Sequence, residues 1–337
     1  LSDDGEPCIL YGELYTKYKS ETIREVISKT NIDNTKLVRS KANDVIIPCS
    51  GETAEDIATA RCVLNCNILL GGDLNIIRLH GYDGTFMSYQ LNGKRKYDIA
   101  KVAQGVSVVH LYGEHLKGVK TINPCLEEQK KIASLLALLD ERIATQNKII
   151  DKLQSLIKGL RVCLIQKEDG EIVYLNEIAQ IYQPKTISST ELTDDGFLVY
   201  GANGIIGKYK DYNHKTEQIC ITCRGNTCGM VNYTKPMSWI TGNAMVVNTD
   251  EHQDIVFKRY LYHYLSAYNF NSIISGSGQP QIVRTPLEKL KIALPSILEQ
   301  EQRAMLLDKI QGKIDMYNNM LRLYLQQKQY LLRQMFI

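Results

Sequence analysis

The sequence lacks the features that define several special classes of protein. Its best candidate for a membrane span, residues 106–116, contains Ser107, His110 and Glu114 and is far shorter than the roughly 20 apolar residues required. No basic segment followed by an apolar core opens the chain, so no secretory signal peptide is expected. The net charge is only +3, so any nucleic acid would have to be bound through local basic patches.

Motifs for cofactor-dependent and hydrolytic enzymes are also missing. The glycines at 201, 204 and 207 do not form a Gly-x-Gly-x-x-Gly motif, and no Gly-Lys-Ser/Thr phosphate loop is present. No methyltransferase-like Asn-Pro-Pro-Tyr or Asp-Pro-Pro-Tyr motif occurs, and the six histidines suggest no catalytic triad. We therefore expect a protein that is not an enzyme and needs no cofactor.

Nine cysteines in a chain without an export signal indicate reduced thiols in a cytoplasmic protein. Cys220, Cys223 and Cys228, or the pair Cys62 and Cys66, could suggest a zinc site. A structural zinc site needs four ligands, and no second well-spaced cysteine or histidine pair follows Cys228. We predict no metal site.

At 337 residues the chain is long enough for two domains, and an internal repeat supports that number. The segment 124–129 is matched by 295–300, 171 positions later, and Gly105 matches Gly276 at the same spacing. Upstream, residues 1–5 resemble 192–196, residues 72–74 resemble 242–244, and Tyr11-Gly12 resembles Tyr200-Gly201 with two extra residues before it. An ordered series of matches indicates a duplication.

Each copy ends in a predicted helix whose apolar residues alternate spacings of three and four, which is typical of a coiled coil. The first helix leads into the second domain, so the second helix can bury its apolar seam by running back antiparallel. Gln146 and Lys328 interrupt the seam; they could fix its register or mark a frayed stretch. The predicted interface residues are Leu136, Leu139, Ile143, Ile150, Leu153, Ile157, Leu307, Ile310, Ile314, Leu321 and Leu331.

The segments before the helices are predicted to be mixed and β-rich. Strands are expected at 45–47, 219–221 and 245–247, and helices at 20–28 and 257–267. The second copy opens with a strand and a helical turn over 173–181 that have no counterpart before Leu1, so the first copy is expected to lack its start. The predicted α+β architecture has an internal pseudo-twofold duplication and consists of a domain at 1–125, a spacer helix at 126–165, a domain at 166–295 and a spacer helix at 296–337.

This arrangement resembles the specificity subunits of type I restriction-modification systems. The resemblance rests on the segments 175–179, 200–207 and 276–282, and on the two Pro-x-x-Leu/Glu-Glu-Gln helix starts. It implies two target-recognition domains that each read one half of a split double-stranded DNA sequence. It also implies antiparallel helices that act as a spacer, a subunit without an active site, and docking to methylation subunits, two in number, with restriction subunits in the full complex. In the first copy, residues 105–111 lack the Gln-Pro-Gln of the second copy.

Candidate DNA contacts are basic and amide side chains in loops, because arginine can bind guanine or phosphate and asparagine or glutamine can bind adenine. The alternative for each of them is a solvated loop or turn residue. A coiled-coil scaffold with duplicated domains that bind protein or glycan remains the alternative function. The candidates are Ser50, Lys94, Arg95, Lys96, Lys208, Tyr209, Arg224, Asn226, Gln279, Gln281 and Arg284.

Overall fold

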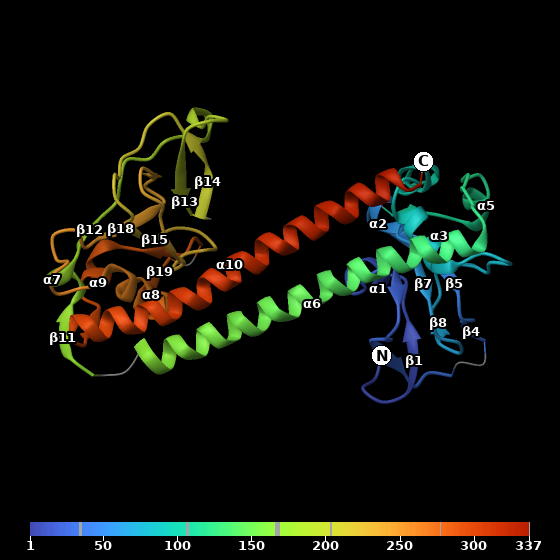
Figure 1. Cartoon of the computed structure of the whole chain (residues 1–337), viewed down its shortest axis with the longest axis horizontal. Coiled ribbons are helices and arrows are strands. Elements are labelled where there is room, and N and C mark those ends of the chain that lie inside the picture. Colours follow the sequence, from blue (N-terminus) through green and yellow to red (C-terminus); the bar gives the residue numbers. More distant parts are fainter. Residues whose placement is uncertain (34–35, 106–107, 166–168, 203, 277, 337) are drawn as a thin grey trace. The chain divides into compact units, whose positions relative to one another are not determined.

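The structure, a computed structural model, describes residues 1–33, 36–105, 108–165, 169–202, 204–276 and 278–336. The chain divides into two compact units: Leu1–Lys148 with Tyr317–Ile337 form the first, and Ile149–Met316 form the second. Two long helices, α6 (Leu126–Ile165) and α10 (Ile297–Gln334), each contribute residues to both units (Figure 1). The predicted α+β class and the two long helices are confirmed.

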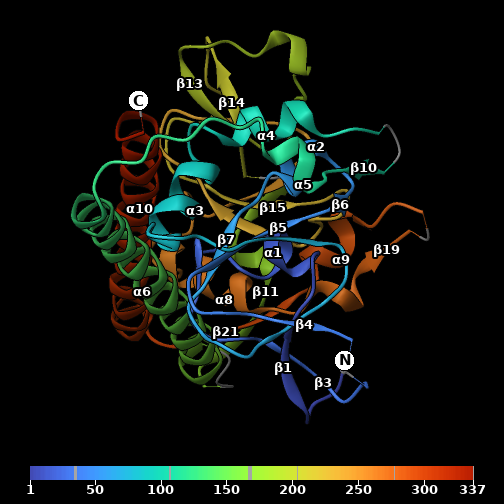
Figure 2. The same ribbon diagram turned by 90° about the vertical axis from the view of Figure 1, so that its right-hand side faces the viewer.

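The first unit contains two four-stranded sheets with the orders β3-β1-β8-β4 and β2-β7-β5-β9. All five side chains of β5 are buried, and β5 runs antiparallel between β7 and β9. A short pair, β6 and β10, forms a separate ladder near α2 and α5 (Figure 2). The strands are β1 (Glu6–Ile9), β2 (Thr22–Ile23), β3 (Ser28–Thr30), β4 (Val38–Arg39), β5 (Asp44–Pro48), β6 (Ser50–Gly51), β7 (Arg61–Val63), β8 (Leu69–Leu70), β9 (Leu74–Ile77) and β10 (Val109–His110). The short helices are α1 (Glu13–Thr16), α2 (Ala54–Ile57), α3 (Gly84–Asn92), α4 (Lys96–Val102) and α5 (Gly113–Leu116).

The second unit has a four-stranded sheet of order β12-β18-β15-β16 and a three-stranded sheet of order β14-β13-β17. Its most buried strand is β15, which pairs antiparallel with β18 and β16. The strands are β11 (Glu171–Tyr174), β12 (Gln180–Tyr182), β13 (Phe197–Gly201), β14 (Gly204–Tyr209), β15 (Ile219–Thr222), β16 (Val231–Tyr233), β17 (Trp239–Ile240), β18 (Ala244–Asn248), β19 (Ile274–Ser275), β20 (Gln281–Ile282) and β21 (Lys291–Leu294). The helices are α7 (Leu175–Ile178), η1 (Ser189–Glu191), α8 (Lys258–Ala267), η2 (Phe270–Ser272) and α9 (Arg284–Glu288).

One predicted helix, at residues 20–28, is wrong. Thr22 and Ile23 instead form β2, which pairs in parallel with Cys62 and Val63, and β3 begins at Ser28. The β-branched pair Thr-Ile favours an extended strand, and Ile23 is buried in that conformation. The strands predicted at 45–47, 219–221 and 245–247 and the helix predicted at 257–267 agree with β5, β15, β18 and α8.

The repeated glutamine of the two helix starts has the same function in both units. Gln129 and Gln300 are each 1% exposed, and their side-chain amides donate to the carbonyls of Pro124 and Pro295, at 2.7 and 2.9 Å. Their carbonyl oxygens accept from the backbone N–H at the N-cap of the domain helix, which is Asp83 before α3 and Phe257 before α8. These N–H groups have no partner within their own helices. The glutamine therefore joins each long helix to its domain.

The repeated glycine before β10 and after β19 turns the chain in a conformation that side chains disfavour. Gly105 has φ +122° and Gly276 has φ +95°. An added Cβ would lie 2.1 Å from the Val108 carbonyl oxygen in one copy and 2.3 Å from the Gln279 carbonyl oxygen in the other. The two turns therefore match in geometry although their sequences differ. Of the residues that carried the resemblance, Asn203 and Ser277, and in the first copy Val106 and Ser107, lie outside the described part of the chain.

The alignment of Tyr11 with Tyr200 is wrong. The backbone carbonyl of Ile9 accepts from Gly71 N–H at 2.9 Å, and that of Tyr200 accepts from Thr241 N–H at 2.9 Å, each at the end of a parallel strand pair. Ile9 therefore corresponds to Tyr200, and the two extra residues are not needed. The sequence comparison paired the two tyrosines because they are identical residues, whereas their positions in the strands pair Tyr200 with Ile9.

Within each unit the two long helices and one domain helix share an apolar core. In the first unit, Ala133 and Leu136 of α6 pack with Phe336, with partly buried Leu331 of α10 and with Phe86 of α3. In the second unit, the equivalent core contains Leu153 and Ile157 of α6, Leu307, Ile310 and Ile314 of α10 and Tyr260 of α8. Leu139 and Ile150 are also buried, whereas Ile143 and Leu321 are half-buried. Over the described residues, no helix is apolar over a length that could cross a bilayer.

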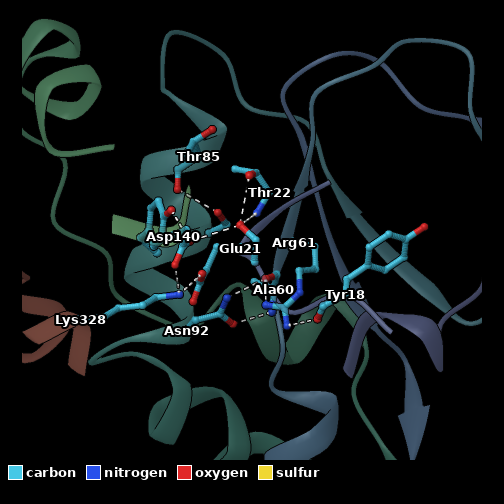
Figure 3. Close-up of polar contacts among 12 residues, drawn as sticks. Tyr18, Glu21, Thr22, Ala60, Arg61, Thr85, Asn92, Asp140 and Lys328 are labelled. Carbon is cyan, nitrogen blue, oxygen red and sulfur yellow. Dashed lines mark hydrogen bonds and ion pairs between the residues drawn. The ribbon is translucent and has the colours of Figure 1, made fainter. Parts of the chain in front are cut away.

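A buried charge cluster connects the long helices to the first unit (Figure 3). Lys328 Nζ lies 2.6 Å from a carboxylate oxygen of Glu21 and 2.6 Å from one of Asp140, and all three side chains are about one-tenth exposed. Tyr89 of α3 donates its hydroxyl to Asp140 at 2.7 Å. Burial, together with Asp140, raises the pKa of Glu21, although Lys328 opposes the shift. Lys328 is thus held between the two carboxylates and does not mark a frayed stretch.

Candidate nucleic-acid interface

The clearest candidate surface in the second unit is the loop that follows β15. Cys223 is buried, while Arg224 and Asn226 are exposed. Hydroxyl groups of Thr222 and Thr227 both donate to the Ala202 carbonyl, at 2.9 and 2.6 Å, and hold the base of the loop. The loop is therefore anchored by a buried strand and presents a guanidinium and an amide to solvent.

The structure brings Arg224 beside the glutamine-rich segment predicted separately from it. Arg224 and Gln281 form an antiparallel bridge, and the flanking hydrogen bonds join Gly225 N–H to Pro280 and Ile282 N–H to Cys223, each at 3.0 Å. Directly opposite residues in an antiparallel pair carry their side chains on the same face. A guanidinium and an amide therefore lie next to each other, the two groups that most often bind guanine and adenine edges.

The other predicted DNA contacts of this unit differ in how strongly neighbouring residues hold their side chains. Gln279 is exposed, whereas Arg284 is held by Glu288 at 2.6 Å within one helical turn. Lys208 lies 3.6 Å from Asp195, and Tyr209 packs edge-on against Trp239 with ring centroids 5.1 Å apart. Arg284, Lys208 and Tyr209 are thus less available to a ligand than Arg224.

The first unit has the same backbone arrangement with different side chains. Ser50 and Gly51 of β6 pair antiparallel with His110 and Val109 of β10, and Leu111 N–H donates to Cys49 at 2.8 Å. Ser50, predicted to contact DNA, is nearly buried, and its hydroxyl donates to Asp73 at 3.3 Å. His110, which the sequence reasoning missed, therefore occupies the place of Gln281. The spacing of 171 residues between them was the signal that could have identified it.

Three neighbouring cations, Lys94, Arg95 and Lys96, do not form one patch. Lys94 is exposed, but Arg95 is the N-cap of α4 and lies 3.4 Å from Asp98. Lys96 is half-buried at a cavity of about 380 Å³ that Tyr97, Arg333 and others line. Burial, with Arg61 adding to it, lowers the pKa of Lys96. Lys94 is the member of this group most open to a phosphate.

Among the described residues, cysteines and carboxylates do not gather in a metal-binding arrangement. No group of three or more His, Cys, Asp or Glu side chains that could hold a metal ion occurs within the described ranges. Cys220 and Cys223 are buried, and burial raises the pKa of the Cys220 thiol to about 12. Such a thiol stays protonated at neutral pH, and only the thiolate is a good metal ligand.

Comparison with known proteins bears on the whole arrangement. The sequence profile of the type I restriction modification DNA specificity domain matches residues 167–322. Residues 167–322, a little under half of the chain, are thus similar to this domain. Its match includes most of the second unit and continues along α10, so the domain of this family contains the loop with Arg224 and the segment with Gln281.

One curated relative is similar to part of the chain and another to most of it. The specificity subunit of the type I restriction enzyme EcoprrI from Escherichia coli is 32% identical over 151 residues, 42% of this chain and 37% of the relative. The chain thus aligns with well under two thirds of that relative's length. The MjaVIII specificity subunit from Methanocaldococcus jannaschii is 25% identical over 354 residues, covering 90% of this chain and 80% of the relative.

A solved structure has the same fold. The type I restriction-modification system S subunit from M. genitalium superimposes with a TM-score of 0.70 at 19% identity, covering 98% of this chain and 92% of that one. At that identity the likeness establishes the fold alone.

Proposed function

We propose that this chain is the specificity component of a type I restriction-modification system and that each unit reads one half of a split double-stranded DNA sequence. The observation that carries the proposal is the surface repeated in both units, where a loop after a buried strand pairs with a second segment. In the second unit this surface presents Arg224 and Gln281. The match of residues 167–322 to the specificity-domain family supports the same function.

The chain itself is proposed to carry no catalytic activity. It would act in the cytoplasm with methylation subunits, and with restriction subunits in the full complex. Leu135 of α6 and Leu306 of α10 lie 171 positions apart and are 49% and 46% exposed. A repeated apolar position on the two helices fits two copies of one partner, since duplicated surfaces can bind identical subunits. This supports two methylation subunits per chain.

The proposal is tested by co-expressing the full chain with its methylation subunit and sequencing the methylome. The expected result is a split motif with two fixed halves. Enrichment of no DNA motif, together with capture of a protein or glycan, would support the alternative of a coiled-coil scaffold and overturn the proposal.

The substitution Arg224→Ala tests whether the second unit reads the second half-site through this loop. We expect one base position in that half to relax, with a loss of roughly 1–3 kcal/mol in discrimination, while the other half is unchanged. Arg284→Ala is the matched control because Glu288 already holds its guanidinium, and it should alter discrimination less. An unchanged motif and affinity for Arg224→Ala would show that this loop is only a turn.

A further inference from the structure

The surface of the first unit that corresponds to Arg224 and Gln281 contains neither a guanidinium nor an amide at the paired positions. Ser50 takes the place of Arg224 and His110 takes the place of Gln281. The correspondence is one of geometry. His110 and Gln104 exchange backbone hydrogen bonds of 2.7 and 2.9 Å, and Gln281 pairs with Ser275 in the same way, each pair closing the glycine turn described above.

Ser50 cannot supply the missing reading group. Its side chain is only 9% exposed, and its hydroxyl is already bonded to Asp73. The first unit must therefore read its base from another side chain on this ladder, and His110 is the residue opposite Ser50.

His110 is held in a defined orientation at the surface. Its ring stacks on that of Tyr112 with centroids 6.0 Å apart and planes within 5° of parallel. Tyr112 in turn packs against His115 at 5.6 Å, and the Tyr112 N–H donates to His115 Nδ1 at 3.3 Å. His110 is half-exposed and Tyr112 is 53% exposed, so the stacked pair faces solvent. A fixed, partly exposed imidazole can present an N–H donor and a ring acceptor to a ligand.

We propose that His110, stacked on Tyr112, is the specificity-determining residue of the first unit and reads one base pair of the first half-site. The inference rests on the proposed function and assigns a residue to the unit for which sequence reasoning offered only a buried serine and a dispersed basic run. An imidazole nitrogen can hydrogen-bond to one base edge in the major groove, where the four base pairs present different donors and acceptors. The antiparallel pairing of β10 with β6, two strands labelled in Figure 2, fixes the backbone of His110 opposite Ser50.

The test uses the full chain with its methylation subunit and methylome sequencing as the readout. His110→Ala should lower discrimination at one base position of the first half-site by about tenfold or more, and leave the second half-site as in the wild type. His110→Gln, which installs the residue of the second copy, should change the preferred base at that same position. His80→Ala removes an exposed histidine elsewhere in the first unit and should leave both half-sites unchanged.

The outcomes separate this inference from the proposed function. If the wild type yields no split motif, the proposed function fails. If the wild type yields one and neither His110 variant alters the first half-site, or if the changed position lies in the second half-site, the assignment of His110 is wrong. An unchanged second half-site in the variant also shows that the chain is folded. His110→Asn, a smaller change, repeats the test if the alanine variant does not accumulate.

Discussion

In both units a polar cluster links the domain helix to the two long helices, but the side chains in the two clusters differ. In the first unit, Tyr89 bonds to Asp140 of α6, and Lys328 of α10 supplies the cation. In the second unit, His263 bonds to Asp308 of α10 at 2.8 Å. There Arg161 of α6 donates to His263 at 3.3 Å. The aspartates Asp140 and Asp308 thus come from the first halves of α6 and α10, and the cations Arg161 and Lys328 come from the second halves. Two copies of a repeat whose long helices run antiparallel require this exchange.

The difference lies in how far each cluster is removed from water. Glu21 and Asp140 are about one-tenth exposed and share one lysine, and burial raises the pKa of Glu21. Asp308 is 28% exposed and accepts hydrogen bonds from Nε and Nη2 of Arg259. Burial opposes its charge, but hydrogen bonds from His263 and Arg259 bring the pKa of Asp308 below its usual value. The first cluster therefore depends on each of its members more strongly than the second.

Exchange of a whole unit should have the largest effect on recognition. Leu153 to Ile165 of α6 and Ala304 to Ile314 of α10 share a core with α8, so an exchange of residues 149–316 transfers that core intact. We expect such an exchange with the matching segment of a specificity subunit of another system to replace the second half-site and preserve the first, as measured by methylome sequencing. An exchange of 166–295 divides the core and should yield a less stable protein. A 149–316 exchange that altered both half-sites would contradict independent units.

Among single substitutions, Lys328→Met should cause the largest loss of stability. It leaves Glu21 and Asp140 buried without their shared cation, which typically costs about 3–5 kcal/mol. Denaturant unfolding measures the loss. Lys313→Met on the exposed face of α10 is the control and should stay within about 0.5 kcal/mol of the wild type. Equal effects of the two substitutions would show that the charge cluster contributes no specific stability.

Gln129→Leu and Gln300→Leu test whether the two helix starts are equivalent. Each removes a bond to a proline carbonyl and leaves the N-cap N–H of a domain helix without its acceptor, which should cost about 1–3 kcal/mol. Unfolding should show similar losses for both, with exposed Gln302→Leu as the control. A large loss for one and none for the other would mean that only one copy uses the motif in this way.

The smallest expected difference between the two polar clusters is in how their contributions to stability change on acidification. Because the pKa of Asp308 is lowered, its stabilisation is present above the ordinary carboxyl pKa of about 3.9 and is lost as pH falls through the folded value. Burial also lowers the pKa of His263, so its contribution is present above about 6.5 and is lost as pH falls below that. The pKa of Glu21 is raised, so its contribution to stability has the opposite pH dependence: it is present at low pH and is lost as the pH rises.

The Asp308→Asn variant removes the carboxylate and so measures its pH-dependent contribution to stability. Its deficit relative to the wild type should be present at pH 7 and should shrink toward pH 3 in thermal unfolding. Asp315→Asn, an exposed acid on the same helix, should follow the wild type at every pH. A deficit for Asp308→Asn that stays constant with pH would exclude the carboxylate as its cause.

Sequence patterns predicted the helices and the repeat because both depend on spacing. Heptads identified Leu136 and Leu307, which are buried 171 positions apart, and the glutamine repeat identified Gln129 and Gln300. The surface was harder to predict because it depends on which residues face each other across a loop. Nothing local shows that Arg224 lies opposite Gln281, that Ser50 turns inward to Asp73, or that Lys96 enters a cavity.

The charge cluster of the first unit also determines the order in which the protein can fold during synthesis. Glu21 and Asp140 leave the ribosome long before Lys328, and Phe336, which packs on Phe86, emerges later still. A nascent chain that ends before residue 317 therefore holds two carboxylates without their shared lysine and an apolar surface without Phe336. The second unit, at 149–316, is continuous in sequence and can fold as soon as it is made. The domain that is synthesised first is thus completed last.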